Sequence, residues 1–350
     1  MQYFGISQLI QHRGLLSFIA VAFALCICLL ANPSFAKGNP TATPAAKTIK
    51  NKEPLQCLAF SPYVGDLNPD FGSYPPRELI NTLLDNIVRN TPFRCIMTYG
   101  VLNGLEYTFA AAEERHLKVI AIIWLDNDIK VNSQSIQSGI EVAKAFPKTI
   151  IKLSCGSELR TRHGKEFDGE ISRCITSLRA AGVTQPITTI DTWWEWCDRS
   201  KPCQKTIFDK QVDWVGINIF PWWENKYSAA YPCTSAKNAA DFHIARMQTL
   251  NQTYPDKEII VTEFGWPNAP AGGTEFNKHT KQHCGLAGPK NQVRIIQETF
   301  KKLAKKKWSG VAFEAYSEKW KPTQEGGFGD AWGVCQGLPP YACTKIALPH

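Results

Sequence analysis

Two glutamates stand at the ends of apolar segments, where a pair of carboxylates could do acid–base chemistry. Glu263 follows the apolar run 259–261, and the turn Phe-Gly-Trp-Pro comes directly after it. Glu158 ends a similar segment that begins at Ile150. Apolar runs closed by Gly and Pro predict buried strands with a carboxylate at the carboxyl end. One such glutamate can be a simple cap or ion-pair partner, but two on one barrel face form the pair that glycoside hydrolysis requires.

The rest of the chain alternates between strand-like and helix-like segments. Strands are expected over 57–60, 93–99, 118–125, 150–158, 186–191, 212–220, 259–263 and 309–316. Helices are expected over 76–90, 105–116, 133–146, 170–181, 236–254 and 290–306. The strands are continuously apolar rather than alternating, which is typical of a parallel sheet covered on both faces.

This pattern predicts an α/β fold, a (β/α)8 TIM barrel in a single domain. Glu158 then ends the fourth strand and Glu263 the seventh. A doubly wound open sheet is the alternative. The chain lacks a glycine-rich phosphate loop after its first strand, where that fold holds its nucleotide, so we favour the barrel.

Residues 1–36 have the pattern of a secretory signal peptide. Arg13 supplies a positive charge, 15–30 is apolar, and Ser34 and Ala36 are small residues before a cleavage point. An uncleaved membrane anchor is the alternative, because the run is near the lower length limit for spanning. Residues 37–54 predict a solvated linker, rich in Lys, Thr, Pro and Ala. We expect a secreted or periplasmic protein whose large domain covers 55–350, with membrane contact only through the signal peptide.

Ten cysteines remain after residue 36, and an even count in an exported chain favours disulfides. The short separations suggest Cys197–Cys203 and Cys335–Cys343, and Cys233–Cys284 would join two long loops. Metal binding is the rival interpretation. No Cys-x-x-Cys pair occurs, and His279 and His283 beside Cys284 lie in a Gly- and Lys-rich loop. We therefore expect no metal.

The formal net charge is +8, and removal of Arg13 with the signal peptide leaves +7. Part of this charge is a lysine cluster at 301–307, near the end of an expected helix. Such a cluster is usually a solvated face that suits the helix dipole. We expect no nucleic-acid partner, and adhesion to an anionic envelope surface is a weaker alternative.

Aromatic and polar residues gather after the expected strands. Flat sugar faces stack on aromatic rings while carboxylates bind hydroxyls, so this composition suits a carbohydrate cleft; about half of the rings should instead pack in the core or at the rim. The candidate substrate-binding residues are Tyr63, Tyr99, Trp193, Phe220, Trp222, Trp223, Glu318, Trp320 and Lys321.

The chain resembles glycoside hydrolase family 17, particularly bacterial β-1,3-glucanases and glucanosyltransferases, over nearly all of residues 55–335. The motifs that carry the resemblance lie, in order, at 60–63, 98–100, 156–158, 187–193, 217–224, 262–267, 313–321 and 325–327. The resemblance implies a retaining catalytic domain with Glu158 as acid/base and Glu263 as nucleophile. The two carboxyl groups should lie roughly 5–5.5 Å apart, with the higher pKa at Glu158.

Three positions depart from the family pattern. Ser157 replaces an Asn that binds the sugar 2-hydroxyl, Met97 replaces an Arg that keeps the nucleophile ionised, and Ser317 replaces an Asp. We retain Ser157 among the substrate-binding residues. These changes predict altered specificity or weakened catalysis.

Two functions remain open. The favoured one is an enzyme that hydrolyses or transfers β-1,3-linked glucosyl units of an oligo- or polysaccharide, acting as a monomer without a cofactor. The alternative is a non-catalytic glucan-binding envelope protein that keeps the barrel cleft. A disulfide-rich structural protein with no sugar ligand is the third possibility.

Overall fold

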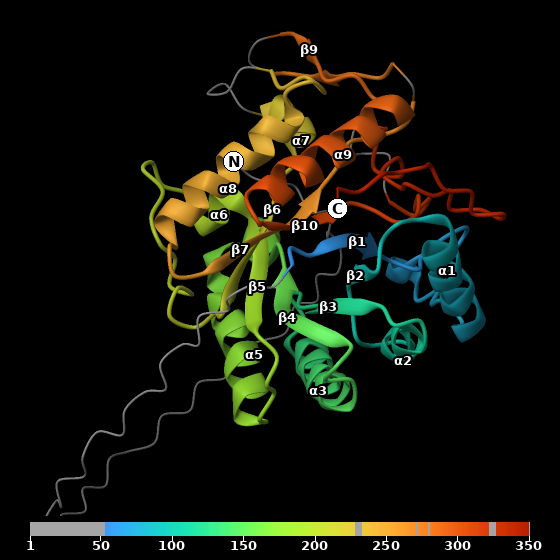
Figure 1. Cartoon of the computed structure of the whole chain (residues 1–350). Coiled ribbons are helices and arrows are strands. Elements are labelled where there is room, and N and C mark those ends of the chain that lie inside the picture. Colours follow the sequence, from blue (N-terminus) through green and yellow to red (C-terminus); the bar gives the residue numbers. More distant parts are fainter. Residues whose placement is uncertain (1–52, 228–232, 271, 279–280, 322–326, 350) are drawn as a thin grey trace, which may run out of the picture. The chain divides into compact units, whose positions relative to one another are not determined.

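The computed structural model describes residues 53–227, 233–270, 272–278, 281–321 and 327–349. Eight parallel strands close into a barrel in the order β1-β10-β7-β6-β5-β4-β3-β2, and the helices surround it (Figure 1). The strands are β1 (Gln56–Phe60), β2 (Cys95–Thr98), β3 (Lys118–Ile123), β4 (Ile150–Ser157), β5 (Ile187–Thr192), β6 (Trp214–Asn218), β7 (Glu258–Phe264) and β10 (Ser309–Ala312). The longer helices are α1 (Arg77–Asn90), α2 (Tyr107–Glu114), α3 (Ile129–Ala145), α5 (Asp168–Ala180), α8 (Ala239–Thr253) and α9 (Pro289–Lys305). The predicted (β/α)8 barrel is confirmed.

Alternate residues of each strand enter two separate apolar clusters. In β3, Ile120 and Ile122 belong to a small cluster made mainly of strand residues. Val119, Ala121 and Ile123 belong to a much larger cluster that includes the helices. Because successive strand side chains point to opposite faces, the small cluster fills the barrel and the large one joins it to the helices. This burial on both faces explains the continuous apolar runs in the sequence.

Helix α3 begins at Ile129, four residues before the expected start at Ser133. The Asp128 side chain accepts hydrogen bonds from the backbone N–H groups of Lys130 (2.9 Å) and Val131 (3.1 Å). An aspartate at this position satisfies N–H groups that lack partners within the helix. The cap therefore allows two exposed apolar residues, Ile129 and Val131, to be helical.

Several short elements were not expected from the sequence. They are the helices α4 (Leu159–His163), α6 (Trp193–Trp196) and α7 (Pro221–Tyr227) and the hairpin of β8 (Glu275–Phe276) and β9 (His283–Cys284). Helices α4, α6 and α7 come directly after β4, β5 and β6. They are too short to show a helical period, so the sequence pattern gave no signal for them. They shape the end of the barrel where catalytic groups gather.

Five disulfides are present, and they include the three expected pairs. Those three are Cys197–Cys203, Cys233–Cys284 and Cys335–Cys343; the other two are Cys57–Cys95 and Cys155–Cys174. Cys57–Cys95 joins the neighbouring strands β1 and β2, and Cys155–Cys174 joins β4 to α5. The disulfide at Cys284 removes the thiolate from the rival metal site, and His279 lies outside the described residues.

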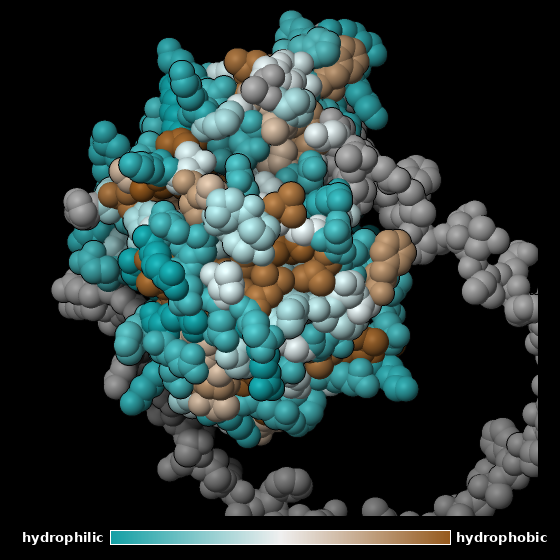
Figure 2. Space-filling view, turned by 90° about the vertical axis from the view of Figure 1, so that its right-hand side faces the viewer, coloured by the Kyte–Doolittle hydropathy of each residue, from teal (hydrophilic) through white to brown (hydrophobic). Residues whose placement is uncertain are grey.

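The surface of the domain is largely hydrophilic, with small apolar patches, on the face that Figure 2 shows. The most exposed apolar side chains, Phe71, Leu338, Ile129 and Ile207, belong to different segments of the chain. Within the described residues, none of the helices has the length and apolar character needed to cross a membrane. The predicted signal peptide and nearly all of the linker lie outside the described residues.

Candidate active site

Glu158 and Glu263 lie at the carboxyl ends of two barrel strands. Glu263 is the penultimate residue of β7 and is 7% exposed. Glu158 directly follows β4 and adopts a left-handed backbone conformation with φ 54°. Its N–H donates to the carbonyl of Ile190 in β5 at 2.8 Å, which holds the turn against the neighbouring strand. The expected placement of both carboxylates at one barrel rim therefore holds.

Asn218, the last residue of β6, connects the two glutamates. Its Nδ2 donates to Oε1 of Glu158 at 2.9 Å, and a hydrogen bond from its side chain also lowers the pKa of Glu263. The Thr262 hydroxyl donates to Oδ1 of Asn218 at 2.8 Å, so the NH₂ end of the amide must face the carboxylates. Asn218 was not among the predicted site residues, although a polar residue that ends a buried apolar strand is a signal that could have found it.

The two carboxyl groups share a buried environment, and their pKa values reflect it. Burial and the charge of Glu158 raise the pKa of Glu263 to about 8, against hydrogen bonds from Tyr99 and Asn218 and the charge of Lys321. Burial also raises the pKa of Glu158, opposed by Asn218 and Arg162. Two like charges in one dry site disfavour simultaneous ionisation, so the pair holds one proton between them near neutral pH.

The expected order, with the higher pKa at Glu158, stays a prediction. Burial raises the pKa of both carboxyl groups, and the charge of Glu158 adds to the rise at Glu263. Arg162 opposes the rise at Glu158, since a cation favours the ionised carboxylate.

Tyr99 and Lys321 are two predicted residues that act on Glu263. The Tyr99 hydroxyl donates to Oε1 of Glu263 at 2.8 Å. Nζ of Lys321 lies 2.5 Å from Oε2 of Glu314 and 2.7 Å from Oε2 of Glu318. Met97 is fully buried and carries no charge. The positive charge that lowers the pKa of Glu263 comes from Lys321 instead.

Glu318 and Glu314 are both only 1% exposed. The Ser61 hydroxyl donates to Oε1 of Glu318. Burial raises the pKa of Glu314 well above its ordinary value, although the Lys321 charge opposes the rise. One lysine thus compensates two buried carboxyl groups, and Glu318 holds both Lys321 and Ser61 in place.

The predicted aromatic residues divide into cleft and core. Trp222 is fully buried and packs edge-on against Trp266 and Phe328, with ring centroids 5.0 and 4.7 Å away. Its assignment to substrate binding was wrong, because the helix α7 turns it into the core. Its neighbour Trp223 and Phe220 are partly exposed, and both pack against Trp332.

Of the remaining predicted rings, Tyr63 and Trp193 are buried, each 7% exposed, and Trp320 is partly exposed. Tyr63 and Trp320 meet edge-on with centroids 6.3 Å apart. Nε1 of Trp193 donates to Oε1 of Glu224 at 2.8 Å, and burial raises the pKa of Glu224 to about 7. Ser157 is 3% exposed, and its proposed contact with a sugar hydroxyl stays a prediction.

A cationic group not singled out from the sequence stands on the Glu158 side. Arg162 lies over the ring of Trp124 at 4.5 Å and donates to the carbonyls of Leu125 (2.8 Å) and Ser157 (3.2 Å). It also pairs with Asp126 at 3.1 Å. The arrangement combines an aromatic face with charged hydrogen-bonding groups, which suits a ring bearing hydroxyls.

A closed barrel with two buried glutamates at the carboxyl ends of its strands is an architecture that suits the hydrolysis of glycosidic bonds. A family model described as "BtgE/BtgC glycoside hydrolase domain" matches residues 57–333, and the chain belongs to this family. The resemblance to glycoside hydrolase family 17 is thereby confirmed.

Known relatives are distant. The "Glucan 1,3-beta-glucosidase" of Arthroderma benhamiae is 24% identical over 237 residues, covering 64% of this chain and 70% of the relative. The "Probable beta-glucosidase btgE" of Emericella nidulans is 22% identical over 257 residues, covering 69% of this chain but only 41% of the relative.

A family 17 β-1,3-glucanosyltransferase from Rhizomucor miehei shares the fold. Its crystal structure has a TM-score of 0.62 at 16% identity and covers 81% of this chain and 93% of that one. An active-site mutant of that enzyme in complex with laminaritriose has a TM-score of 0.64 at 16% identity, covering 84% and 97%.

Proposed function

We propose that this protein is an exported retaining glycosidase that acts on β-1,3-glucans through a glycosyl-enzyme intermediate. The observation that carries the proposal is the contact of one buried amide, Asn218, with both Glu158 and Glu263. The substrate follows from the names of similar proteins, a glucan 1,3-beta-glucosidase and a β-1,3-glucanosyltransferase in complex with laminaritriose. Five disulfides support export, because such bonds persist in oxidising compartments.

In the first step Glu263 is the nucleophile. A carboxylate oxygen of Glu263 forms a bond to the anomeric carbon as the glycosidic C–O bond breaks, and Glu158 gives its proton to the leaving oxygen. Tyr99 and Lys321 favour the ionised nucleophile, since a hydrogen bond and a positive charge both stabilise the carboxylate. The shared proton must therefore reside on Glu158 when the sugar is bound.

In the second step the roles of Glu158 reverse. Esterification removes the charge of Glu263, which lowers the pKa of Glu158 and makes it a base. Glu158 then takes a proton from water or from a sugar hydroxyl, whose oxygen bonds to the anomeric carbon and releases Glu263. Water gives hydrolysis, and a sugar acceptor gives transfer.

Aromatic residues near the site affect which acceptor, water or a sugar, reaches the intermediate. The partly exposed rings of Phe220, Trp223 and Trp320 could hold an acceptor sugar. A bound acceptor raises the local concentration of sugar hydroxyls against water, which favours transfer. Both hydrolysis and transfer therefore belong to the proposal.

The second candidate is a glucan-binding envelope protein without turnover. Its support is the replacement of three family residues, by Met97, Ser157 and Ser317. Retention of the paired carboxylates and the presence of Lys321 near Glu263 oppose it.

The test is incubation of the exported protein, with its disulfides intact, with laminari-oligosaccharides, followed by mass spectrometry. Shorter sugars alone indicate hydrolysis, and longer sugars as well indicate transfer. The matched control is Glu263→Gln, which keeps the shape of the side chain but cannot act as the nucleophile. Measurable binding with no products from the wild type would replace the enzyme by the glucan-binding protein.

A further inference from the structure

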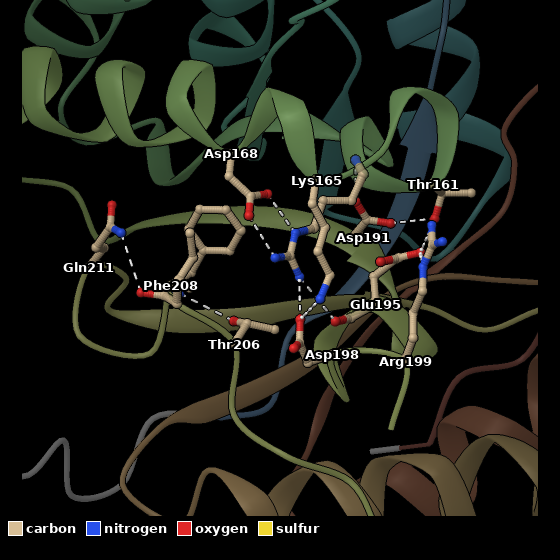
Figure 3. A network of polar contacts seen from close by, with 12 residues as sticks. Thr161, Lys165, Asp168, Asp191, Glu195, Asp198, Arg199, Thr206, Phe208 and Gln211 are labelled. Atoms are coloured by element: carbon tan, nitrogen blue, oxygen red, sulfur yellow. Dashed lines mark hydrogen bonds and ion pairs between the residues drawn. The ribbon is translucent and has the colours of Figure 1, made fainter. Parts of the chain in front are cut away.

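Asp191 is a buried carboxyl group next to the turn that carries Glu158. It lies in β5 and is 3% exposed. Its Oδ2 accepts from the backbone N–H of Arg160 at 3.0 Å, and its Oδ1 accepts from the Thr161 hydroxyl at 2.5 Å and from the N–H of Thr192 at 2.8 Å. Figure 3 shows Asp191 and Thr161 facing each other within a network of charged groups.

The contacts of Asp191 hold the backbone that follows Glu158 in the chain. The N–H of Glu158 is bonded to Ile190, the residue before Asp191, at 2.8 Å. Strand β5 therefore holds the turn at Glu158 itself and at Arg160 and Thr161, two and three residues further along the chain. Glu158 has φ 54°, a left-handed conformation that is unfavourable for a residue with a side chain. Such a conformation persists only where neighbouring contacts hold it.

Charged groups surround Asp191, but the nearby cations are occupied. Arg160 makes a two-pronged pair with Asp168 at 2.6 and 2.7 Å and also contacts Asp198. Glu158 and Glu195 are the charged groups that act on Asp191 directly. The other charged groups around Asp191 and the turn are Arg160, Arg162, Lys165, Asp168, Asp198 and Arg199. Among the described residues no ion pair reaches Asp191, whose three donors are neutral.

Asp191 and Glu158 are therefore coupled in charge as well as in position. Burial and the charge of Glu158 together raise the pKa of Asp191 to about 7, while hydrogen bonds from Thr161 and Thr192 oppose the rise. By reciprocity, a negative charge on Asp191 favours the protonated form of Glu158. That is the form that an acid catalyst needs before the glycosidic bond breaks.

We propose that Asp191 is a positioning residue that holds the Glu158 turn in place and keeps the acid catalyst protonated. This inference rests on the proposed glycosidase function, since it assigns Asp191 a role in the acid step only. Asp191 touches the turn and not the cleft, so it acts through Glu158 and not on the sugar.

The test compares two substrates in the Asp191→Asn variant of the full chain. The leaving group of a laminari-oligosaccharide is a sugar oxygen, which needs a proton as the bond breaks. The leaving group of a 2,4-dinitrophenyl β-laminaribioside is 2,4-dinitrophenolate, which is a stable anion and needs no proton. We expect kcat/KM on the oligosaccharide to fall roughly 10- to 100-fold, and kcat/KM on the aryl glycoside to change by less than about 3-fold. The basic limb of the pH profile on the oligosaccharide should move to lower pH.

Asp213→Asn is the matched control. Asp213 also accepts a hydrogen bond from a backbone N–H group of β5, that of Ile187, at 2.8 Å. Ile187 is the first residue of β5, at the opposite end of the strand from Glu158. The control should leave the ratio of the two activities unchanged. Thr161→Val, which removes one hydrogen bond to Asp191 without changing a charge, gives a second variant if Asp191→Asn does not fold, and it should show a smaller fall on the oligosaccharide alone.

The outcomes separate this inference from the function on which it rests. An equal fall on both substrates, or no fall on either, would overturn the positioning role while leaving the glycosidase intact. A wild type that turns over neither substrate would overturn the proposed function and the inference together.

Discussion

Nδ2 of Asn218 donates a 2.9 Å hydrogen bond to Oε1 of Glu158, and the amide can do so only because its oxygen is held by Thr262. The same amide lowers the pKa of Glu263, although the strands of the two glutamates, β7 and β4, are separated by β6 and β5 in the barrel order. A neutral donor between two carboxyl groups stabilises the ionised form of each and does not fix which of the two is ionised. In the proposed mechanism Asn218 therefore stabilises the ionised Glu263 before it attacks the sugar, and the ionised Glu158 after its proton has gone to the leaving oxygen.

Replacing Asn218 by Ala should lower kcat/KM on laminari-oligosaccharides by roughly 100-fold, because a positioned donor to a catalytic carboxylate is worth two to three powers of ten. The fall should appear mainly in kcat, which steady-state kinetics can separate from KM. Asn251→Ala is the control, since that amide binds only the carbonyl of Met247 within α8. A variant at Asn218 with wild-type kcat would remove this amide from the catalytic machinery.

Lys321→Met should destabilise the protein and shift its pH profile. The change leaves Glu314 and Glu318 buried without their shared cation, and breaking a buried pair on one side costs about 3–5 kcal/mol. It also removes a charge that lowers the pKa of Glu263, so the acid limb of the activity profile should move to higher pH.

Denaturant unfolding and a pH–rate series measure these two effects of Lys321→Met. Lys319→Met is the matched control, because the Lys319 side chain is 73% exposed and its pair with Asp66 lies at the surface. That variant should leave the free energy of unfolding nearly unchanged, because solvent screens an exposed pair. Equal effects of the two lysine variants would contradict the role assigned to Lys321.

The barrel could be predicted from the sequence because each strand is buried on both faces and reads as a continuous apolar run. Glu158 and Glu263 stood out for the same reason, as charges directly after such runs. Asn218 has an equivalent position, but an amide is less conspicuous than a carboxylate at the end of a strand.

The details that failed depend on three-dimensional packing. Trp222 and Trp223 are identical neighbours in the sequence, and successive helix positions point about 100° apart, so only the docking of α7 decides which one is buried. The rise in the pKa values of Glu158 and Glu263 likewise depends on the position and the burial of each carboxyl group. Neither quantity is a property of a local sequence pattern.

Trp222 and Trp223 should therefore respond differently to the same substitution. Trp222→Ala removes a fully buried ring between Trp266 and Phe328 and should cost about 3–5 kcal/mol of unfolding free energy. Trp223→Ala removes a partly exposed ring and should raise KM for oligosaccharides with a smaller loss of stability. Thermal unfolding and steady-state kinetics on both variants check this; a raised KM in a fully stable Trp222→Ala protein would return Trp222 to the cleft.

The stability of the protein should fall as the pH rises from about 5 to 8. Glu263 has a pKa of about 8 when folded, against 4.5 as the ordinary value, so between these values the folded state keeps a proton that the unfolded state has released. The unfolding free energy then decreases with pH by up to about 1.4 kcal/mol for each unit of pKa difference. The buried Asp191 and Glu224, each with a pKa of about 7, act in the same direction.

Glu263→Gln removes the largest of these contributions, so its stability relative to the wild type should increase across that pH range and level off above pH 8. Denaturant midpoints at pH 5, 6.5, 8 and 9 measure the difference. Glu298→Gln is the control, because it makes the same change in a partly exposed carboxylate that is paired with Arg294 on α9. Parallel stability curves for the wild type and Glu263→Gln would mean that Glu263 is ionised in the folded protein throughout this range, and the proton shared by the pair would then belong to Glu158 even before a sugar binds.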